Sequence, residues 1–189
     1  MIACSRPKIS RVALSGYGWN VKRVLVFGPG ASGKTTFAIR LGEITGLPVI
    51  ELDKVFWRSG VVPTPPDEWA RVQRELIQKH MWILDGDLGP YDVVEARLPA
   101  ADTIIVLDFS VARCAWRALR RSRERFDFWL WLLRYQRHSL PLLMASIAKH
   151  AHGAELHVLR TPEALRKFLE DVVAPHQAPS IDDKSITLI

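Results

Sequence analysis

The sequence predicts an α/β protein in which a parallel β-sheet is covered by helices on both faces. Two observations lead to this prediction: short apolar, β-branched runs alternate with longer segments of helical periodicity, and a glycine-rich stretch directly follows the first run. Each run is almost entirely apolar, which is typical of strands buried on both faces of a parallel sheet. Strands that alternate with helices form βαβ units with right-handed crossovers.

Five strands are expected, each bounded by turn or acidic residues. They are Val21–Phe27, Leu47–Leu52, Trp82–Leu84, Thr103–Leu107 and Glu155–Leu159. The helical patterns between and after them are Lys34–Ile44, Glu68–His80, Val111–Arg123, a region from Phe128 to Lys149 interrupted at Pro141, and Pro162–Val173. The last helix has the clearest start, because Thr161 is a suitable N-cap and Pro162 fits the first helical position.

The length and composition indicate one globular domain. A chain of 189 residues with 48% apolar and 24% charged residues can bury a substantial core, which excludes collagen-like and wholly disordered classes. We expect the domain to span residues 21–174, with flexible segments at 1–20 and 175–189. Two cysteines form no disulfide framework, and no transmembrane or export signal is convincing, so we expect a cytoplasmic protein.

Positive charge is concentrated in one part of the chain. Residues 111–150 carry nine Lys and Arg against two acids, a net charge of +7, whereas the remainder carries 17 against 18, a net charge of −1. This segment should face something anionic, such as phosphates, nucleic acid or a lipid surface. The alternative is an ordinary solvated helix face.

A phosphate-binding loop is the sharpest motif. Residues Gly28-Pro29-Gly30-Ala31-Ser32-Gly33-Lys34-Thr35 match GxxxxGKS/T between a predicted strand and a predicted helix, the context that this motif requires. Its backbone amides and the following helix start would cradle the phosphates of ATP. Lys34 would neutralise the β and γ oxygens, and Thr35 would offer a hydroxyl to Mg²⁺. The nucleotide-binding residues expected here are Gly28, Gly30, Ala31, Ser32, Gly33, Lys34, Thr35 and Thr36.

Acidic residues stand at three predicted strand ends, where ligands of parallel sheets collect. Asp85, followed by Gly86, could hold the water shell of Mg²⁺, and Asp108 could do the same; a helix cap is the alternative for both. Asp53 could receive the proton of an alcohol acceptor, or could simply close a turn after its strand.

The basic segment combines arginines with aromatic residues. Arg117 and Arg121 are four residues apart, so one helix face would carry both guanidinium groups towards a transferring phosphoryl group. The run from Phe126 to Tyr135 is unusually aromatic, and we favour ordinary packing over a membrane-surface or base-stacking role. The histidines of this half of the chain share no spacing that would favour a metal site.

From about Val24 to Leu169 the sequence resembles the P-loop nucleoside and nucleotide kinases around adenylate kinase. More narrowly, it resembles the adenylate-kinase-related proteins called DNA topology modulation proteins, or FlaR-like proteins. The departures are Asp87 in place of an expected Asn, Ser110-Val111 in place of a frequent Pro-Arg pair, and a short segment between Arg125 and Phe128. The residues that carry the resemblance are Gly28–Thr35, Leu52-Asp53, Phe56-Trp57, Trp82–Gly86, Arg97, Ala101–Asp108, Arg117–Arg121 and His157–Thr161.

This resemblance implies a three-layer P-loop NTPase fold with strand order 2-3-1-4-5. It implies ATP and Mg²⁺ on the first loop, an acceptor near strands two and three, and an arginine-bearing lid, here about residues 111–127. By position, Arg117 and Arg121 resemble lid-base arginines, Arg97 resembles an arginine on the acceptor side, and Arg160 lies where such enzymes approach the nucleotide base.

The leading functional hypothesis is an ATP-dependent kinase with a nucleotide or another small molecule as acceptor. Lys34, Asp53, Arg117 and Arg121 are the expected catalytic residues, Asp53 and Arg97 the acceptor contacts, and Thr35 and Asp85 the metal ligands. The alternative is an ATP-regulated nucleic-acid-binding protein with little or no kinase activity. A GTPase is disfavoured, because Asn20 is the only asparagine and the guanine-reading Asn-Lys-x-Asp signature is therefore impossible. Neither the acceptor nor the oligomeric state follows from the residues.

Overall fold

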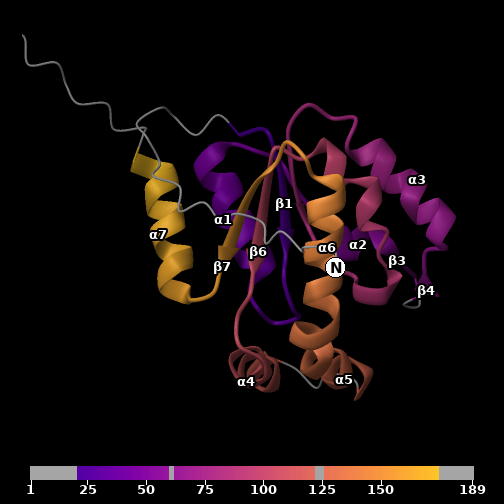
Figure 1. Cartoon of the computed structure of the whole chain (residues 1–189), viewed down its shortest axis with the longest axis vertical. Helices are drawn as coiled ribbons and strands as arrows, with labels where there is room; N and C mark the ends of the chain where they lie inside the picture. The colour runs from indigo at the N-terminus through magenta and orange to yellow at the C-terminus, as the bar shows by residue number, and fades with distance from the viewer. Residues whose placement is uncertain (1–20, 60–61, 122–125, 175–189) are drawn as a thin grey trace, which may run out of the picture.

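The central sheet has five parallel strands. The computed structural model describes residues 21–59, 62–121 and 126–174, so the terminal segments expected to be flexible lie outside the described residues. The sheet has the order β2-β5-β1-β6-β7, which becomes 2-3-1-4-5 when its own strands are counted along the chain (Figure 1). The strands are β1 (Arg23–Phe27), β2 (Val49–Glu51), β5 (Trp82–Asp85), β6 (Thr103–Leu107) and β7 (Glu155–Leu159).

Helices cover both faces of this sheet, as predicted (Figure 1). Alternate residues of a strand point to opposite faces, so Leu25 and Phe27 of β1 belong to one hydrophobic cluster and Val24 and Val26 to the other. The first cluster packs under α3 (Pro66–Leu76) and α6 (Leu140–His150), and the second under α1 (Lys34–Thr45) and α7 (Pro162–Val173). A sheet buried on both faces needs strands that are apolar throughout, which explains the continuous apolar runs.

The segment after β2 differs from the prediction. The strand ends at Glu51, and the short helix α2 (Leu52–Phe56) begins where the sequence pattern still indicated a strand. A small antiparallel pair, β3 (Trp57–Arg58) with β4 (Val62–Pro63), follows as a separate sheet that the sequence did not predict. Helix α3 begins at Pro66, two residues earlier than expected, because proline suits the first helical turn.

The helical region after Arg125 is continuous in the described residues, so the predicted interruption at Pro141 is wrong. Helix α5 (Phe126–Arg134) passes through the π-helical turn η4 (Tyr135–Ser139) into α6, whose first turn contains Pro141. Proline has no N–H, and its ring crowds the carbonyl four residues earlier; the wide turn before it relieves that crowding.

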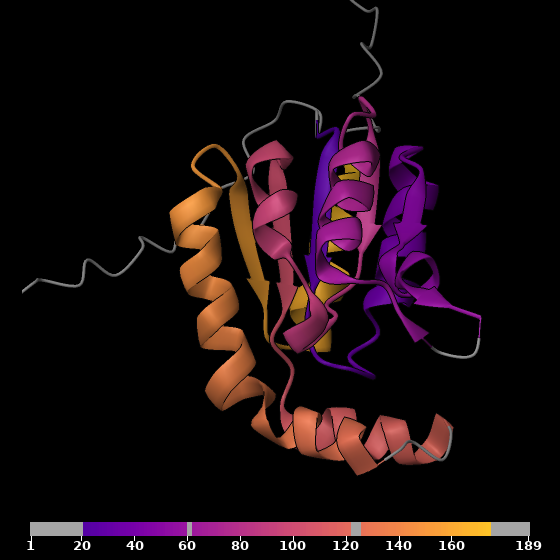
Figure 2. The ribbon, with the colours of Figure 1, turned by 90° about the vertical axis from the view of Figure 1, so that its right-hand side faces the viewer.

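The chain bends at this turn, and the bend positions the site. Figure 2 shows α6 running along the sheet and α5 turning to lie across the carboxyl ends of the strands, beside α4 (Val111–Arg121). Three short 3₁₀ turns, η1 (Gly89–Tyr91), η2 (Val94–Ala96) and η3 (Leu98–Ala100), connect β5 to β6. The carboxyl ends of the strands therefore face two helices rather than open solvent.

Candidate active site

The loop between β1 and α1 forms a tight turn. The amide of Ser32 donates to the carbonyl of Pro29 at 3.2 Å, and Ala31 and Gly33 have φ values of 58° and 95°. Ala31 is the one non-glycine residue with positive φ in the described ranges, a conformation that costs about 1 to 2 kcal/mol. Such strain concentrates at functional sites.

Lys34 folds back across this loop. Its Nζ donates to the carbonyl of Pro29 at 3.3 Å, so its charge lies over the concave side of the turn. The first helical amide with a described acceptor is that of Phe37, which donates to Gly33 at 3.0 Å. The amides of residues 34–36 are the unpaired N–H groups that begin every helix, and they attract anions.

Asp85 ends β5 directly beside this loop. Its side chain is buried, and its Oδ1 has no hydrogen-bond partner among the described residues. Burial raises the pKa of Asp85, while Lys34 and a hydrogen bond from the Thr35 side chain act in the opposite direction. The hydroxyl of Ser32 in the loop is also buried without a partner. Unsatisfied polar atoms in a native interior need an explanation, and a ligand, water or ion that completes the site is one.

A cavity of about 950 Å³ opens from the loop. Of the predicted site residues, the structure brings Gly30, Ala31, Gly33, Lys34, Thr35, Thr36, Asp53 and Arg117 together along its wall. Further lining residues that the sequence analysis did not select are Trp57, Asp87, Leu88, Tyr91, Trp116, Arg120, Phe128 and Trp131. The cavity therefore joins the phosphate-binding loop to the segments that follow β2 and β5.

Asp53 lies in the first turn of α2 and lines the cavity. Burial raises its pKa; Lys34 lowers it, and the carboxylates of Asp87, Asp92 and Glu51 raise it again. A carboxyl group with a raised pKa is a better proton acceptor for an alcohol than an ordinary aspartate.

Asp87 is a second carboxylate in the cavity wall. Its Oδ2 accepts a hydrogen bond from the Tyr135 hydroxyl at 2.6 Å, and its Oδ1 accepts one from the Gly89 amide at 3.1 Å. Burial raises the pKa of Asp87, and it outweighs these two hydrogen bonds and the charge of Lys34, which act to lower the pKa. The sequence marked Asp87 in two ways, by its place two residues after Asp85 at the end of a strand and as a departure from the Asn expected from the resemblance.

Helix α5 closes directly onto the loop. A β-carbon at Gly30 would overlap Phe128 Cε2 and would lie 3.0 Å from Trp131 Cζ3. Trp131 also reaches Gly89, where a β-carbon would lie 2.7 Å from its Nε1. The aromatic run therefore does more than pack against the core, because two of its members form a wall of the cavity.

The arginines of α4 take different positions. Arg117 donates from Nη1 to the Ser32 carbonyl at 3.3 Å, and Arg120 stacks on Trp116 with its guanidinium carbon 3.9 Å from the ring centroid. Both line the cavity, whereas Arg113 lies over Phe109. The side chain of Arg121 lies outside the described residues, as do Arg123 and Arg125.

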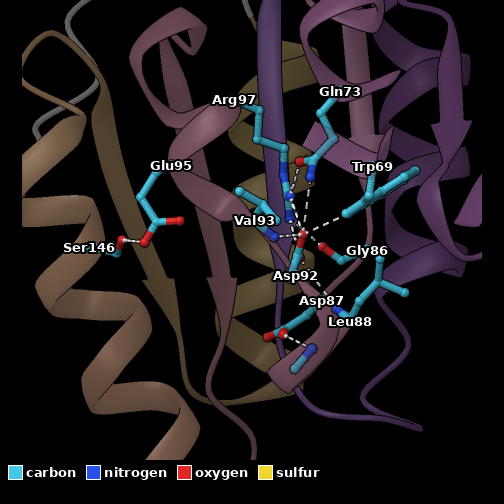
Figure 3. Close-up of polar contacts among 11 residues, drawn as sticks. Trp69, Gln73, Gly86, Asp87, Leu88, Asp92, Val93, Glu95, Arg97 and Ser146 are labelled. Carbon is cyan, nitrogen blue, oxygen red and sulfur yellow. Dashed lines mark hydrogen bonds and ion pairs between the residues drawn. The ribbon is translucent and has the colours of Figure 1, made fainter. Parts of the chain in front are cut away.

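Arg97 does not reach the cavity, which corrects its predicted place as an acceptor contact. It is fully buried, and its two terminal nitrogens donate to the two oxygens of Asp92 at 2.7 and 2.8 Å (Figure 3). It also donates to Gln73 and to the Gly86 carbonyl, and it lies over the Phe27 ring. Arg97 therefore holds the backbone between β5 and η1 in place and does not line the cavity.

Asp92 is the centre of that network (Figure 3). It accepts hydrogen bonds from Trp69 and Gln73 of α3 and from the amides of Leu88 and Val93. Burial acts to raise its pKa, but Arg97 and these hydrogen bonds outweigh burial, so the pKa lies below its ordinary value. The network ties α3 to the segment that carries Asp87.

Asp108 and Arg160 form a separate pair at the end of β6 and β7. Arg160 Nε donates to Asp108 Oδ2 at 3.2 Å, and Gln136 donates to the other oxygen at 3.4 Å. Neither residue lines the cavity. Asp85 does not line the cavity either, but it interacts with Lys34 and Thr35 of the loop, whereas Asp108 is paired with Arg160. The expected role of Arg160 near a nucleotide base stays a prediction.

The described residues hold no group of three or more His, Cys, Asp or Glu side chains that could bind a metal ion alone. Thr35 and Asp85 together suit Mg²⁺, which keeps several waters and takes other ligands from substrate phosphates. No described helix is both long and apolar enough to cross a bilayer.

Comparison with known proteins bears on the fold. A model of the isopentenyl transferase family matches residues 21–62, and no curated protein matches the chain. Shikimate kinase from Acinetobacter baumannii, solved with shikimate, is 17% identical, with 82% of this chain and 92% of that chain covered and a TM-score of 0.58. Shikimate kinase from Bacteroides thetaiotaomicron is 11% identical, with 84% and 99% covered and a TM-score of 0.50. Such distant likeness shows the fold alone: the chain has an α/β fold like that of these two kinases, with a five-stranded parallel sheet flanked by helices.

Proposed function

We propose that this protein is an ATP-dependent phosphotransferase that acts on a hydroxyl group of a small molecule. The observation that carries the proposal is one cavity whose wall contains both residues of the Gly28–Thr35 loop, with Lys34 over that loop, and Asp53. A carboxylate in the same cavity wall as a phosphate-binding loop suits an alcohol held between a base and a triphosphate.

The loop residues would hold the triphosphate. The amides at the start of α1 and the Lys34 ammonium would contact the β and γ phosphates. Thr35 and Asp85 would hold Mg²⁺, which supplies positive charge between the phosphates when it is bound. The unpaired Oδ1 of Asp85 and the unpaired hydroxyl of Ser32 fit this assignment, because both are buried beside the loop.

The transfer itself needs one bond made and one broken. The acceptor oxygen bonds to the γ phosphorus as the bond from that phosphorus to the β–γ bridging oxygen breaks, and ADP leaves. Asp53 receives the hydroxyl proton, and Arg117 balances the charge on the transferred group. Arg121 is proposed for the same role on its position in the sequence.

Binding and turnover test this proposal together. We expect Lys34→Ala to weaken binding of a non-hydrolysable MgATP analogue, measured by titration calorimetry, by about 100-fold and to abolish ADP formation. Lys22→Ala is the matched control, because Lys22 is exposed just before β1, away from the cavity. Normal binding and turnover of MgATP by Lys34→Ala would overturn the proposal.

The narrower resemblance to the adenylate-kinase-related, FlaR-like proteins stays a prediction. The nucleic-acid alternative rests on the basic segment, of which Arg117 and Arg120 line the cavity. We therefore keep the kinase as the proposed function.

A further inference from the structure

The acceptor side of the cavity is acidic. Asp53 and Asp87 both line it. The segment that begins at Asp85, the last residue of β5, and runs to Ala96 contains four acidic residues and no lysine or arginine. The cations in the cavity wall are Lys34, Arg117 and Arg120, which come from the loop, α1 and α4.

The basic residues closest in sequence to Asp53 and Asp87 pair with acidic residues outside the cavity. Arg97 is fully buried on Asp92, Arg58 pairs with Glu68, and Lys54 pairs with Glu51. None of the three lines the cavity. A bound triphosphate would also occupy Lys34, the cation that faces Asp53. An acceptor carboxylate or phosphate beside Asp53 and Asp87 would therefore meet two carboxylates. Of the other cations in the cavity wall, Arg117 is proposed to contact the transferring phosphoryl group and Arg120 stacks on Trp116.

The same side carries flat apolar surface. Trp57 and Tyr91 lie edge to face with ring centroids 5.9 Å apart, and Trp131, which packs against Gly89 in the segment after β5, also lines the cavity. Aromatic faces suit the apolar side of a ring, and they also attract positive charge. Carboxylates and aromatic faces together select against anions.

We infer that the acceptor is an uncharged or positively charged ring-bearing alcohol, and that Asp53 and Asp87 exclude acceptors with a carboxylate or phosphate group. The inference rests on the proposed function and narrows it. Among nucleotide-like acceptors it selects nucleosides over nucleoside monophosphates. Asp87 is the residue that determines specificity, because Tyr135 and Gly89 hold its carboxylate at the cavity wall.

Acceptors matched in shape and different in charge test this inference. ADP formation is measured with adenosine against adenosine 5′-monophosphate, with methyl shikimate against shikimate, and with glucosamine as a cationic probe. For at least one pair, or for glucosamine, we expect phosphorylation of the uncharged or cationic compound. Its kcat/KM should be at least about tenfold above that of the anionic compounds. A higher kcat/KM for either anion overturns the inference, and so does failure of all uncharged and cationic probes.

A charge-removing variant separates specificity from general damage. Asp87→Asn keeps the size of the side chain and can still bond to Tyr135, and we expect it to raise the relative kcat/KM of the anionic member by about tenfold. Asp67→Asn, on the exposed first turn of α3, is the matched control and should leave the ratio unchanged. An unchanged ratio in Asp87→Asn overturns the role of Asp87.

Nucleotide binding is measured in the same samples by calorimetry. A protein that binds the MgATP analogue but accepts anions retains the proposed function and loses this inference. A protein that does not bind the analogue loses the proposed function itself.

Discussion

Arg117 of α4 is docked on the phosphate-binding loop. Its Nη1 donates to the carbonyl of Ser32 at 3.3 Å, and its Nη2 lies 3.0 Å from the position that a β-carbon at Gly33 would take. Glycine at position 33 therefore serves two purposes, because it adopts the left-handed φ of 95° and leaves room for the guanidinium. An arginine from the segment after β6 thus reaches the loop after β1.

We predict that Arg117→Ala lowers kcat by about 10³-fold, because the guanidinium would no longer balance charge on the transferring phosphoryl group. Steady-state ADP formation with a cognate acceptor measures this effect. Arg113→Ala is the control on the same helix, since Arg113 lies over Phe109 and away from the cavity, and it should stay within about threefold of the parent. Equal effects of the two variants would contradict the assignment.

We predict that Gly30→Ala destabilises the folded protein by about 1 to 3 kcal/mol, because its methyl group would overlap the Phe128 ring. Urea unfolding measures this change. A β-carbon at Gly153 meets nothing within 4 Å, so Gly153→Ala should alter the free energy of unfolding by about 0.5 kcal/mol or less. The double variant Gly30→Ala/Phe128→Ala should lose less stability than the sum of the two single changes, because the small side chain at position 128 leaves room for the methyl group. A loss equal to that sum would argue against the contact.

We predict that Asp92→Asn lowers the free energy of unfolding at pH 7 by about 3 to 5 kcal/mol, because Arg97 would be left buried without its counter-charge. The pKa of Asp92 is lowered in the folded protein, so this stabilisation is complete above the ordinary aspartate pKa. It is lost as the pH falls through the lowered value.

The difference between parent and Asp92→Asn, measured by urea unfolding, should therefore shrink as the pH falls below about 4. Combining Asp92→Leu with Arg97→Met should be less damaging than the sum of the single changes. A difference that stays constant from neutral to acidic pH would show that the ionised pair is not its source.

We predict that Asp85→Asn raises the free energy of unfolding of the nucleotide-free protein by about 1 to 2 kcal/mol while it lowers kcat and the response to Mg²⁺. The reason is that Asp85 is a buried carboxylate with an unpaired oxygen, and burial raises its pKa. Thermal unfolding and Mg²⁺ titrations of ADP formation measure the two effects.

Asp108→Asn is the comparison for this prediction. Asp108 pairs with an exposed Arg160, so its replacement should change stability by about 1 kcal/mol or less and leave the response to Mg²⁺ intact. The opposite pattern, with Asp108→Asn impairing the Mg²⁺ response, would move the metal assignment to the end of β6.

Some elements of the fold follow from local sequence. The strands Thr103–Leu107 and Glu155–Leu159 and the helix Pro162–Val173 have the bounds that the pattern predicts. Each is determined by neighbouring residues: continuous apolar runs for the strands, and for the helix the Thr161 side chain, which accepts a hydrogen bond from the amide of Ala164.

Other features depend on residues far apart in the chain. The sequence marks Arg97 as a cation near β5, but whether it meets a ligand depends on Asp92 and Gln73, which claim its guanidinium. The sequence shows that Phe128 and Trp131 are aromatic but not what they contact. The bend at η4 places them against Gly30.

The sequence by itself determined the α/β class, the central strands and the position of a phosphate-binding loop, because periodicity, glycine and helix capping act within a few residues. Only the tertiary structure decided which charges are free, which aromatic side chains line the cavity, and that Asp87 belongs to it. Those outcomes depend on desolvation and on partners from distant segments, and no local pattern encodes either.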